Sequence, residues 1–482
     1  MNAKENIQTL RKRPGSIGEM LAIALPMVIS HACDTVMTFT DRMFLSRLGP
    51  EIMNAAMAGG MTAMMMMTFF MGLIGYSTAL VAQYLGAGQK ENCGRVTTQA
   101  FILVLAAYPV ILLFKPLVHH YFDLMGIPAR QMGYQLTYFN ILIFGTVIGL
   151  SRTAFSSYFT GTGRTRIVMF AGIASMIVNI GLNYILIFGK LGLPALGIRG
   201  AAFGTLGGGL FGVAVLAAAY FNRRNRLEFG IMRAFRYSRT IMRKLLHYGT
   251  PAGVEFLLTF FAFNLMILLF HSRGSVTATA TTIMFNWDMV SYVPLIGIEV
   301  AVTSLVGRYM GAGDHVTANK AAMAGLKTGA LYSALVLVLF VFFPGRLVQV
   351  FRPAGDSAIF EQAVPTAVFM LRVASFYVVI EAAIATFIGV LRGAGDTRWS
   401  MAASVILHYM MVAGLFFVLK VLNLRAETAW IVVVSVFFLF SVVFYLRYRG
   451  GKWKEINMIR GTPDPVAAAA SENFPDSLPS DM

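Results

Sequence analysis

The stretch LVAQYLGAG, residues 80–88, returns as LVGRYMGAG at residues 305–313, an offset of 225 residues. Two further pairs follow in the same order: Pro26 in ALPM with Pro251 in GTPA at the same offset, and GTGRTR at 161–166 with GAGDTR at 393–398 at an offset of 232. Self-similarity over a nearly fixed distance indicates a repeated structural unit. The chain is therefore predicted to contain two copies of one fold.

The composition indicates that both copies lie in a membrane. Hydrophobic residues make up 57% of the 482 residues and charged residues only 13%, whereas soluble domains average about 45–50% apolar and about 25% charged residues. A helix needs about 20 mainly apolar residues to cross a bilayer. Twelve such runs are predicted, at 19–45, 52–84, 96–118, 131–159, 167–189, 199–221, 242–270, 276–307, 317–343, 363–391, 399–420 and 427–446. They are too long and too continuously apolar for the strands of a membrane β-barrel.

Six spans in each copy define the expected architecture. Because six is even, both copies enter the membrane in the same orientation, as in transporters built from parallel repeats. We therefore predict an all-α integral membrane protein in which two six-helix lobes surround a central cavity. The expected parts are a cytoplasmic N-terminal segment (1–16), the N-lobe (17–221), a basic linker (222–241), the C-lobe (242–446) and a cytoplasmic, partly disordered tail (447–482).

The basic residues predict the orientation. They gather in alternate loops, including the linker and the predicted loops that carry Arg308 and Arg392. The positive-inside rule then places both termini in the cytoplasm, with the chain in the inner (plasma) membrane. The same loops account for the net charge of +17, so no nucleic-acid partner is expected. The GAG turns lack the GxxxxGK[ST] spacing of a phosphate loop and are predicted to be tight turns that end helices at the cytoplasmic surface. Neither a nucleotide nor another cofactor is expected.

Several motifs taken together resemble the multidrug and toxic compound extrusion (MATE) family. They are Pro26 followed by Asp41, the two GAG turns, NIGLNYILIFGKLGLPALGIRGAA at 179–202 and EAAIATFIGVLRGAGDTR at 381–398. The similarity covers about residues 15–450 and is closer to the NorM-type branch. It implies two lobes facing a central cavity and export of organic cations coupled to inward flow of protons or sodium ions.

The resemblance also implies positions for functional residues. Asp41 matches the acid on helix one of the family, and Glu381 matches the acid that NorM-type members carry on helix ten. Asn179 and Asn183 stand where the DinF-type branch has an asparagine followed by an aspartate. NorM-type members have a glutamate eight residues after the proline of helix seven, whereas this chain has Glu255 one turn earlier.

The residues themselves also support a polar site inside the membrane. A charged side chain at the centre of a bilayer costs roughly 2.5–3.5 kcal/mol, so it usually faces a cavity or a partner. Six acids lie more than three residues from the ends of the predicted spans: Asp34, Asp41, Glu255, Asp288, Glu299 and Glu381. His31 shares a face with the aspartates of the first helix, and Tyr292 shares a face with the two acids of the eighth. Each residue either binds an ion or substrate or holds helices together by hydrogen bonds.

Two coupling ions are compatible with these acids. A carboxyl group removed from water favours its protonated form, which suits proton exchange. Asp34 and Asp41 lie on one stripe and disfavour joint ionisation, so we favour protons over sodium. If sodium is the coupling ion, its oxygen ligands are predicted near Glu255, Asp288 and Glu381.

The predicted function is a cation-coupled antiporter, active as a monomer, that exports organic cations, drugs and dyes by alternating access. One alternative is a flippase or exporter of a single biosynthetic product or lipid-linked precursor, whose cavity would be rich in cations for phosphate. More than three residues from the ends of the predicted spans, the only cations are Arg152, Lys327 and Arg372, against the six acids. A membrane-embedded enzyme is the remote alternative, because it would need a nucleophile, a metal cluster or an acid–base pair.

Overall fold

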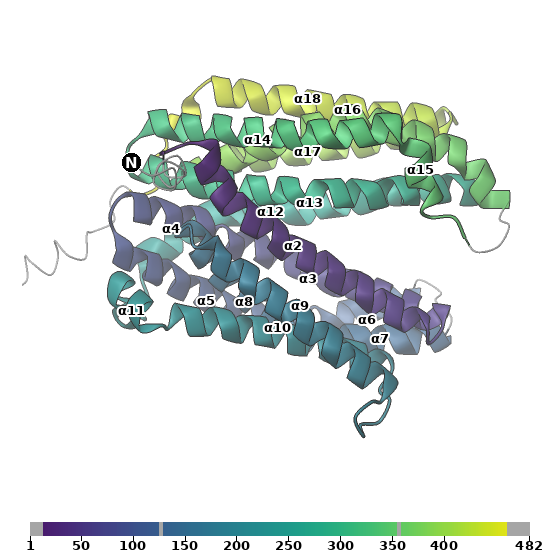
Figure 1. Cartoon of the computed structure of the whole chain (residues 1–482), viewed down its shortest axis with the longest axis horizontal. Coiled ribbons are helices and arrows are strands. Elements are labelled where there is room, and N and C mark those ends of the chain that lie inside the picture. Colours follow the sequence, from purple (N-terminus) through teal and green to yellow (C-terminus); the bar gives the residue numbers. More distant parts are fainter. Residues whose placement is uncertain (1–12, 125–128, 354–357, 460–482) are drawn as a thin grey trace, which may run out of the picture.

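The computed structural model describes residues 13–124, 129–353 and 358–459, and this part of the chain consists of helices and turns without a strand (Figure 1). The first repeat contains α2 (Ile17–Ser46), α3 (Pro50–Gly75), α4 (Ser77–Gly86), α5 (Lys90–Leu113), α6 (Lys115–Leu124), α7 (Ala129–Phe144), α8 (Thr146–Gly161), α9 (Thr165–Phe188) and α10 (Ile198–Tyr220). The linker contains α11 (Arg223–Phe229) and η1 (Ile231–Arg233). The second repeat contains α12 (Arg239–His271), α13 (Ser275–Gly311), α14 (His315–Phe342), α15 (Pro344–Gln349), α16 (Ala358–Ala394), α17 (Thr397–Phe416), η2 (Phe417–Val421), α18 (Ala426–Arg449) and η3 (Lys452–Glu455). The all-α prediction is confirmed.

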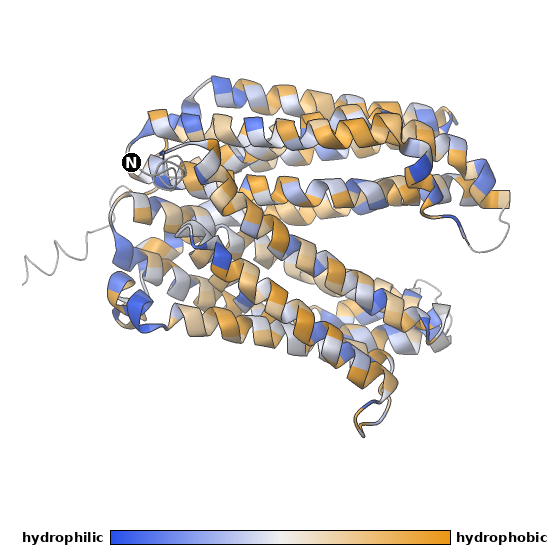
Figure 2. Ribbon diagram, in the orientation of Figure 1, coloured by the Kyte–Doolittle hydropathy of each residue, from blue (hydrophilic) through white to orange (hydrophobic). Residues whose placement is uncertain are grey.

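The predicted number of membrane spans is also confirmed. Within the described residues, 11 helices are long and apolar enough to cross a membrane, or up to 12 when the bent pair α7–α8 counts as one span. This pair bends by 45° at Gly145, where the sequence predicted one continuous span. A Cβ at Gly145 would lie 2.0 Å from Leu206 of α10. Figure 2 shows apolar residues along the helices and many of the hydrophilic residues at their ends.

Two helices extend further than the sequence predicted. α13 continues to Gly311 and α16 to Ala394, so Arg308 and Arg392 lie in the last turns of helices. The prediction that these arginines belong to loops is therefore wrong. Each helix is followed by a glycine with positive φ, Gly313 at 72° and Gly395 at 103°. Glycine adopts this backbone without steric cost, so the helix continues almost up to it.

The two repeats contact each other through two pairs of helices, each pair with one helix from each repeat. α2 of the first repeat packs against α13 of the second, and α12 of the second packs against α3 of the first. Glycines permit both contacts: a Cβ at Gly72 would lie 2.8 Å from the carbonyl oxygen of Ala252, and a Cβ at Gly297 would lie 3.2 Å from that of Ala24. Gly72 and Gly297 are separated by the repeat offset of 225, and the same offset takes Ala24 to position 249, about one helical turn before Ala252.

A reciprocal contact, here called the seam, joins the end of α4 to the ends of α13 and α16. A Cβ at Gly86 would lie 1.8 Å from the carbonyl oxygen of Arg308, and a Cβ at Gly311 would lie 2.0 Å from that of Gln83. Both glycines belong to the repeated GAG turns, which end their helices as predicted. Figure 1 shows the helices of the two repeats close together at this end and diverging toward the end that carries α6 and α15.

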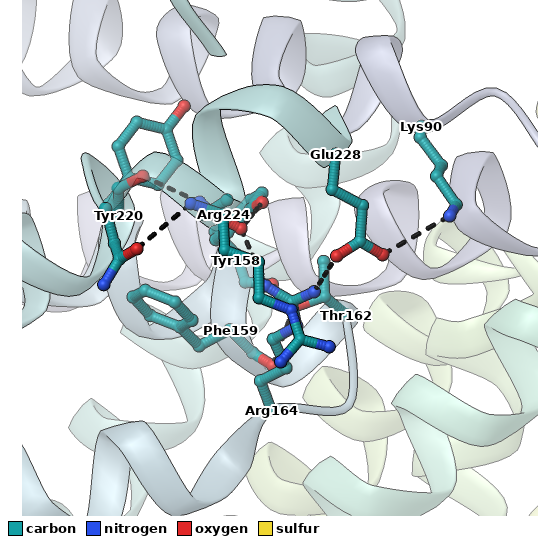
Figure 3. A network of polar contacts seen from close by, with 10 residues as sticks. Lys90, Tyr158, Phe159, Thr162, Arg164, Tyr220, Arg224 and Glu228 are labelled. Atoms are coloured by element: carbon teal, nitrogen blue, oxygen red, sulfur yellow. Dashed lines mark hydrogen bonds and ion pairs between the residues drawn. The ribbon is translucent and has the colours of Figure 1, made fainter. Parts of the chain in front are cut away.

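The linker is bound to the first repeat rather than extended between the repeats. Glu228 of α11 accepts hydrogen bonds from Arg164 at 2.6 Å and from Lys90 at 3.3 Å (Figure 3). Tyr158 donates a hydrogen bond to Asn225 at 2.9 Å. Partial burial alone would raise the pKa of Glu228, but the two cations outweigh this effect and hold the pKa below its usual value. Gln99 of α5 also binds the linker, because its side-chain amide donates to the backbone carbonyl of Arg236 at 2.9 Å.

The segment after α18 returns to the seam. Trp453 is fully buried in the second repeat and donates to the carbonyl of Tyr448 at 2.9 Å. Met458 is 1% exposed and packs in the hydrophobic core of the first repeat. The hydroxyl of Tyr76 lies 3.0 Å from the Met458 sulfur, and a Cβ at Gly395 would lie 2.7 Å from it. This part of the predicted tail packs against both repeats. The stretch from Gly461 onward, where disorder was predicted, lies outside the described residues.

Candidate functional site

Asp41 lies where three helices of the first repeat meet. It is 9% exposed on α2. Asn183 of α9 donates a hydrogen bond to one carboxylate oxygen, and Thr205 of α10 donates to the other at 3.1 Å. The same Asn183 amide also donates to Asn179 at 3.3 Å. The structure thus brings together three of the predicted residues and adds Thr205, which the sequence analysis missed.

Glycines of α10 make this site possible. A Cβ at Gly204 would lie 2.0 Å from the side-chain oxygen of Asn183, and a Cβ at Gly208 would lie 2.6 Å from Cβ of Asn179. These glycines are four residues apart, so they lie on one face of the helix. Small residues at this spacing let two membrane helices approach closely. The GTLGGG stretch was the signal that could have located Thr205.

Asp34 lies in a different setting from Asp41. It forms an ion pair of 2.7 Å with Arg152 of α8, with side chains 39% and 24% exposed. The two aspartates are seven residues apart, or roughly 10 Å along a helix. Arg152 therefore compensates the charge of Asp34. We expected Asp34 and Asp41 to repel each other, but the structure pairs Asp34 with a cation instead. The nearby His31 has a buried Nε2 atom without a hydrogen-bond partner among the described residues.

Asp288 and Glu381 form a carboxyl pair in the second repeat. Asp288 of α13 is 8% exposed and accepts a hydrogen bond from Tyr377 of α16. Glu381 lies one turn after Tyr377, is 7% exposed, and interacts electrostatically with Asp288. Its Oε2 atom is buried without a hydrogen-bond partner among the described residues. Tyr292 lies close to both acids.

Glu255 and Glu299 form a second cluster, which is joined by Arg392. One guanidinium nitrogen lies 3.4 Å from Glu255, and another donates to Glu299. Ser404 of α17 donates to Glu255 at 2.8 Å. The sequence analysis missed Arg392 because the predicted span ended one residue before it.

The three acids proposed for sodium are divided between these two clusters. Glu255 lies 3.4 Å from Arg392, whereas Asp288 and Glu381 interact electrostatically with each other. Across residues 13–124, 129–353 and 358–459, no group of three or more His, Cys, Asp or Glu residues is placed to hold a metal ion.

Comparison with known sequences decides the family. Residues 26–185 and 251–417 each match the MatE family, and together they cover more than half of the chain. The chain belongs to the MatE family. Its two matches begin at Pro26 and Pro251, the pair found at the repeat offset, so they confirm the internal repeat. Members of this family are secondary transporters and not enzymes, which excludes the enzyme alternative.

Relatives of this MatE protein span nearly the whole chain. The probable multidrug resistance protein NorM of Thermotoga maritima is 24% identical over 94% of this chain and 95% of its own length. The protein of the same name from Bradyrhizobium diazoefficiens is 27% identical over 89% and 92%, respectively. The multidrug resistance protein PmpM of Pseudomonas aeruginosa is 26% identical over 81% of each chain. These relatives confirm the resemblance to the NorM-type branch.

Solved structures agree with the fold. A MATE transporter in a bent conformation superposes with a TM-score of 0.83 at 22% identity, covering 94% of this chain and 98% of that chain. A MATE family transporter in an outward-facing conformation gives a TM-score of 0.82 at 22% identity, covering 94% and 100%.

Proposed function

We propose that this MatE protein is a cation-coupled antiporter that exports organic cations, including drugs and dyes, by alternating access. The proposal is supported by its family and by relatives that are named multidrug resistance proteins. The moving parts would be the N-lobe (17–221) and the C-lobe (242–446), joined by the linker (222–241).

The setting of Asp41 carries this proposal. Its described hydrogen-bond partners, Asn183 and Thr205, are neutral, and the structure records no ion pair for it among the described residues. A charged carboxylate in a membrane interior is costly unless a cation accompanies it. A proton, a sodium ion or a positively charged substrate can each supply that charge in turn. Such exchange is what an antiporter requires.

The pair Asp288–Glu381 would serve the second repeat in the same way. Two carboxyl groups that interact electrostatically disfavour joint ionisation, so one of them favours a proton or another cation. The unpartnered oxygen of Glu381 leaves one position for that cation.

We favour protons as the coupling ion. Sodium requires several oxygen ligands around one point, and the acids predicted for it belong to separate clusters. A single carboxyl group suffices for a proton.

The proposed orientation places the seam, the linker and both termini on the cytoplasmic side of a bacterial inner membrane. The basic linker residues Arg223, Arg226 and Arg233 are exposed beside the seam end of the helices, in agreement with the positive-inside rule. The diverging ends near α6 and α15 would then face outward.

Proteoliposomes with purified protein test the function. A pH gradient and a sodium gradient are imposed separately, and movement of a lipophilic cationic dye is followed by fluorescence. We expect transport with the pH gradient in the absence of sodium. Transport driven by sodium alone would reverse the choice of ion. If correctly folded protein moves none of a broad panel of cations, export of organic cations is rejected in favour of a narrow cargo.

A further inference from the structure

Arg392 belongs both to a charged cluster and to the contact between the repeats. Its side chain lies between Glu255 and Glu299, which are 3% and 9% exposed. Carboxylates this deeply buried are stable in the charged form only with a compensating cation. One guanidinium group faces two carboxylates, so the trio has one negative charge left when both acids are ionised. A proton or a monovalent cation would balance it.

The other polar groups around the trio come from three helices. Ser400 and Ser404 of α17 donate to Glu255 at 3.4 Å and 2.8 Å. Among the described residues, the other titratable groups that interact with members of the trio or their neighbours include His408 of α17, Tyr292 and Asp288 of α13, and Glu381 of α16. Outside these helices, Tyr76 of the first repeat interacts with Arg392.

The backbone of the same helical turn forms part of the seam. The carbonyl of Arg392 accepts a hydrogen bond from the hydroxyl of Tyr76 at 3.1 Å. The carbonyl of Gly393 accepts one from the Gln83 amide at 2.9 Å. Both donors belong to the first repeat, so this turn cannot move without changing the contact between the repeats.

The repeat shows that the ion pair is an addition to this contact. At the offset of 232, Arg392 corresponds to Thr160. The carbonyl of Thr160 also accepts a hydrogen bond across the seam, from Ser304 at 2.7 Å. The backbone role is therefore common to both repeats, whereas only the second repeat places a charged side chain at this position.

We propose that Arg392 is a positioning residue that makes the strength of the seam depend on the charge of the Glu255–Glu299 cluster. A cation or proton that binds at Glu255 competes with the guanidinium group and removes one of its two anchors. The last turn of α16 is then less restrained, and the hydrogen bonds from Tyr76 and Gln83 weaken. The inference rests on the proposed function, because a cation-coupled transporter must gain and lose a cation during its cycle.

Distances across the seam test this coupling. Cysteines are introduced at Arg166 and Val316, which are exposed near the seam end of α9 and α14, after Cys33 and Cys93 have been replaced by serine. Spin labels on them report the ratio of open to closed seam in lipid nanodiscs, as a function of pH and of sodium concentration. We expect the ratio to change at least about tenfold over the titration in the wild-type background. Arg392→Gln should abolish this response, and Arg392→Lys should retain most of it.

Two controls make the outcome decisive. Arg398→Gln removes a positive charge from the next helix without touching the cluster and should respond like the wild type. Glu299→Gln/Arg392→Gln removes one charge of each sign, so the cluster keeps its net charge through Glu255 but has no guanidinium group for a cation to displace, and it should also lack the response. A wild-type response in the Arg392→Gln variant or in this double variant would overturn the inference, as would a seam that never responds to pH or sodium. Dye transport separates the two proposals, since transport without an Arg392-dependent seam would reject only this one.

Discussion

Asp41 accepts hydrogen bonds from two neutral side chains, and one oxygen of Glu381 has no hydrogen-bond partner among the described residues. We predict that Asp41→Asn and Glu381→Gln each abolish coupled dye transport while expression and folding stay near normal. The reason is that the charged form was itself costly at these positions, so its removal does not weaken the fold. Transport is measured in proteoliposomes and folding by size-exclusion chromatography. Wild-type transport by both variants would show that these acids only hold helices together and take no part in transport.

Arg152 and Asp34 give a second prediction for single residues. Arg152→Gln should lower the thermal stability in detergent, and the double variant Asp34→Asn/Arg152→Gln should recover part of the loss. The coupling free energy should be below about 1 kcal/mol, because both side chains are partly exposed and solvent screens the pair. A full double-mutant cycle measures it. Additive effects of the two substitutions would show that the ion pair contributes nothing to stability.

At the scale of helices, the packing of α9 against α10 holds the Asp41 site together. We predict that Gly204→Ala destabilises the protein by roughly 1–3 kcal/mol, because its Cβ would overlap with Asn183 and force the helices apart. It should also reduce transport, since Asn183 and Thr205 would no longer both reach Asp41.

Gly181→Ala on α9 is the matched control for this substitution. Nothing lies within 4 Å of its added Cβ, and alanine is favoured over glycine in a helix by roughly 0.5–1 kcal/mol. The melting temperatures of both variants measure the difference in stability between the two substitutions. Equal stability of Gly204→Ala and Gly181→Ala would contradict the close approach of the two helices.

At the scale of the whole molecule, the C-terminal segment adds a contact between the repeats. Met458 is buried between Tyr76 of the first repeat and Gly395 of the second. We predict that Met458→Ala costs roughly 2–5 kcal/mol of stability, the usual range for a buried methionine. It should also raise the population with an open seam in the spin-label experiment.

An exposed methionine provides the comparison. Met232 is 61% exposed in the linker, so Met232→Ala should change stability by less than about 0.5 kcal/mol. The same melting curves report both variants. If Met458→Ala leaves the stability and the seam unchanged, the segment merely rests on the surface of the repeats.

Sequence alone predicted the membrane spans, the internal repeat and the helix-ending GAG turns. These features depend on apolar length, on recurrence and on the backbone freedom of glycine, all of which are properties of short stretches. It also identified the buried acids, because a carboxylate within an apolar run is conspicuous wherever it lies.

The contacts of each acid became visible only in the folded protein. Asp34 meets Arg152 rather than Asp41, and Arg392 joins Glu255 to Glu299. These contacts connect helices that are far apart in the sequence, and their geometry follows from how closely the helices pack. Helical periodicity gives the face on which a side chain lies, but not which helix covers that face. The division of the acids into separate clusters, and the closure of the seam by both repeats, therefore became visible only when the helices were packed together.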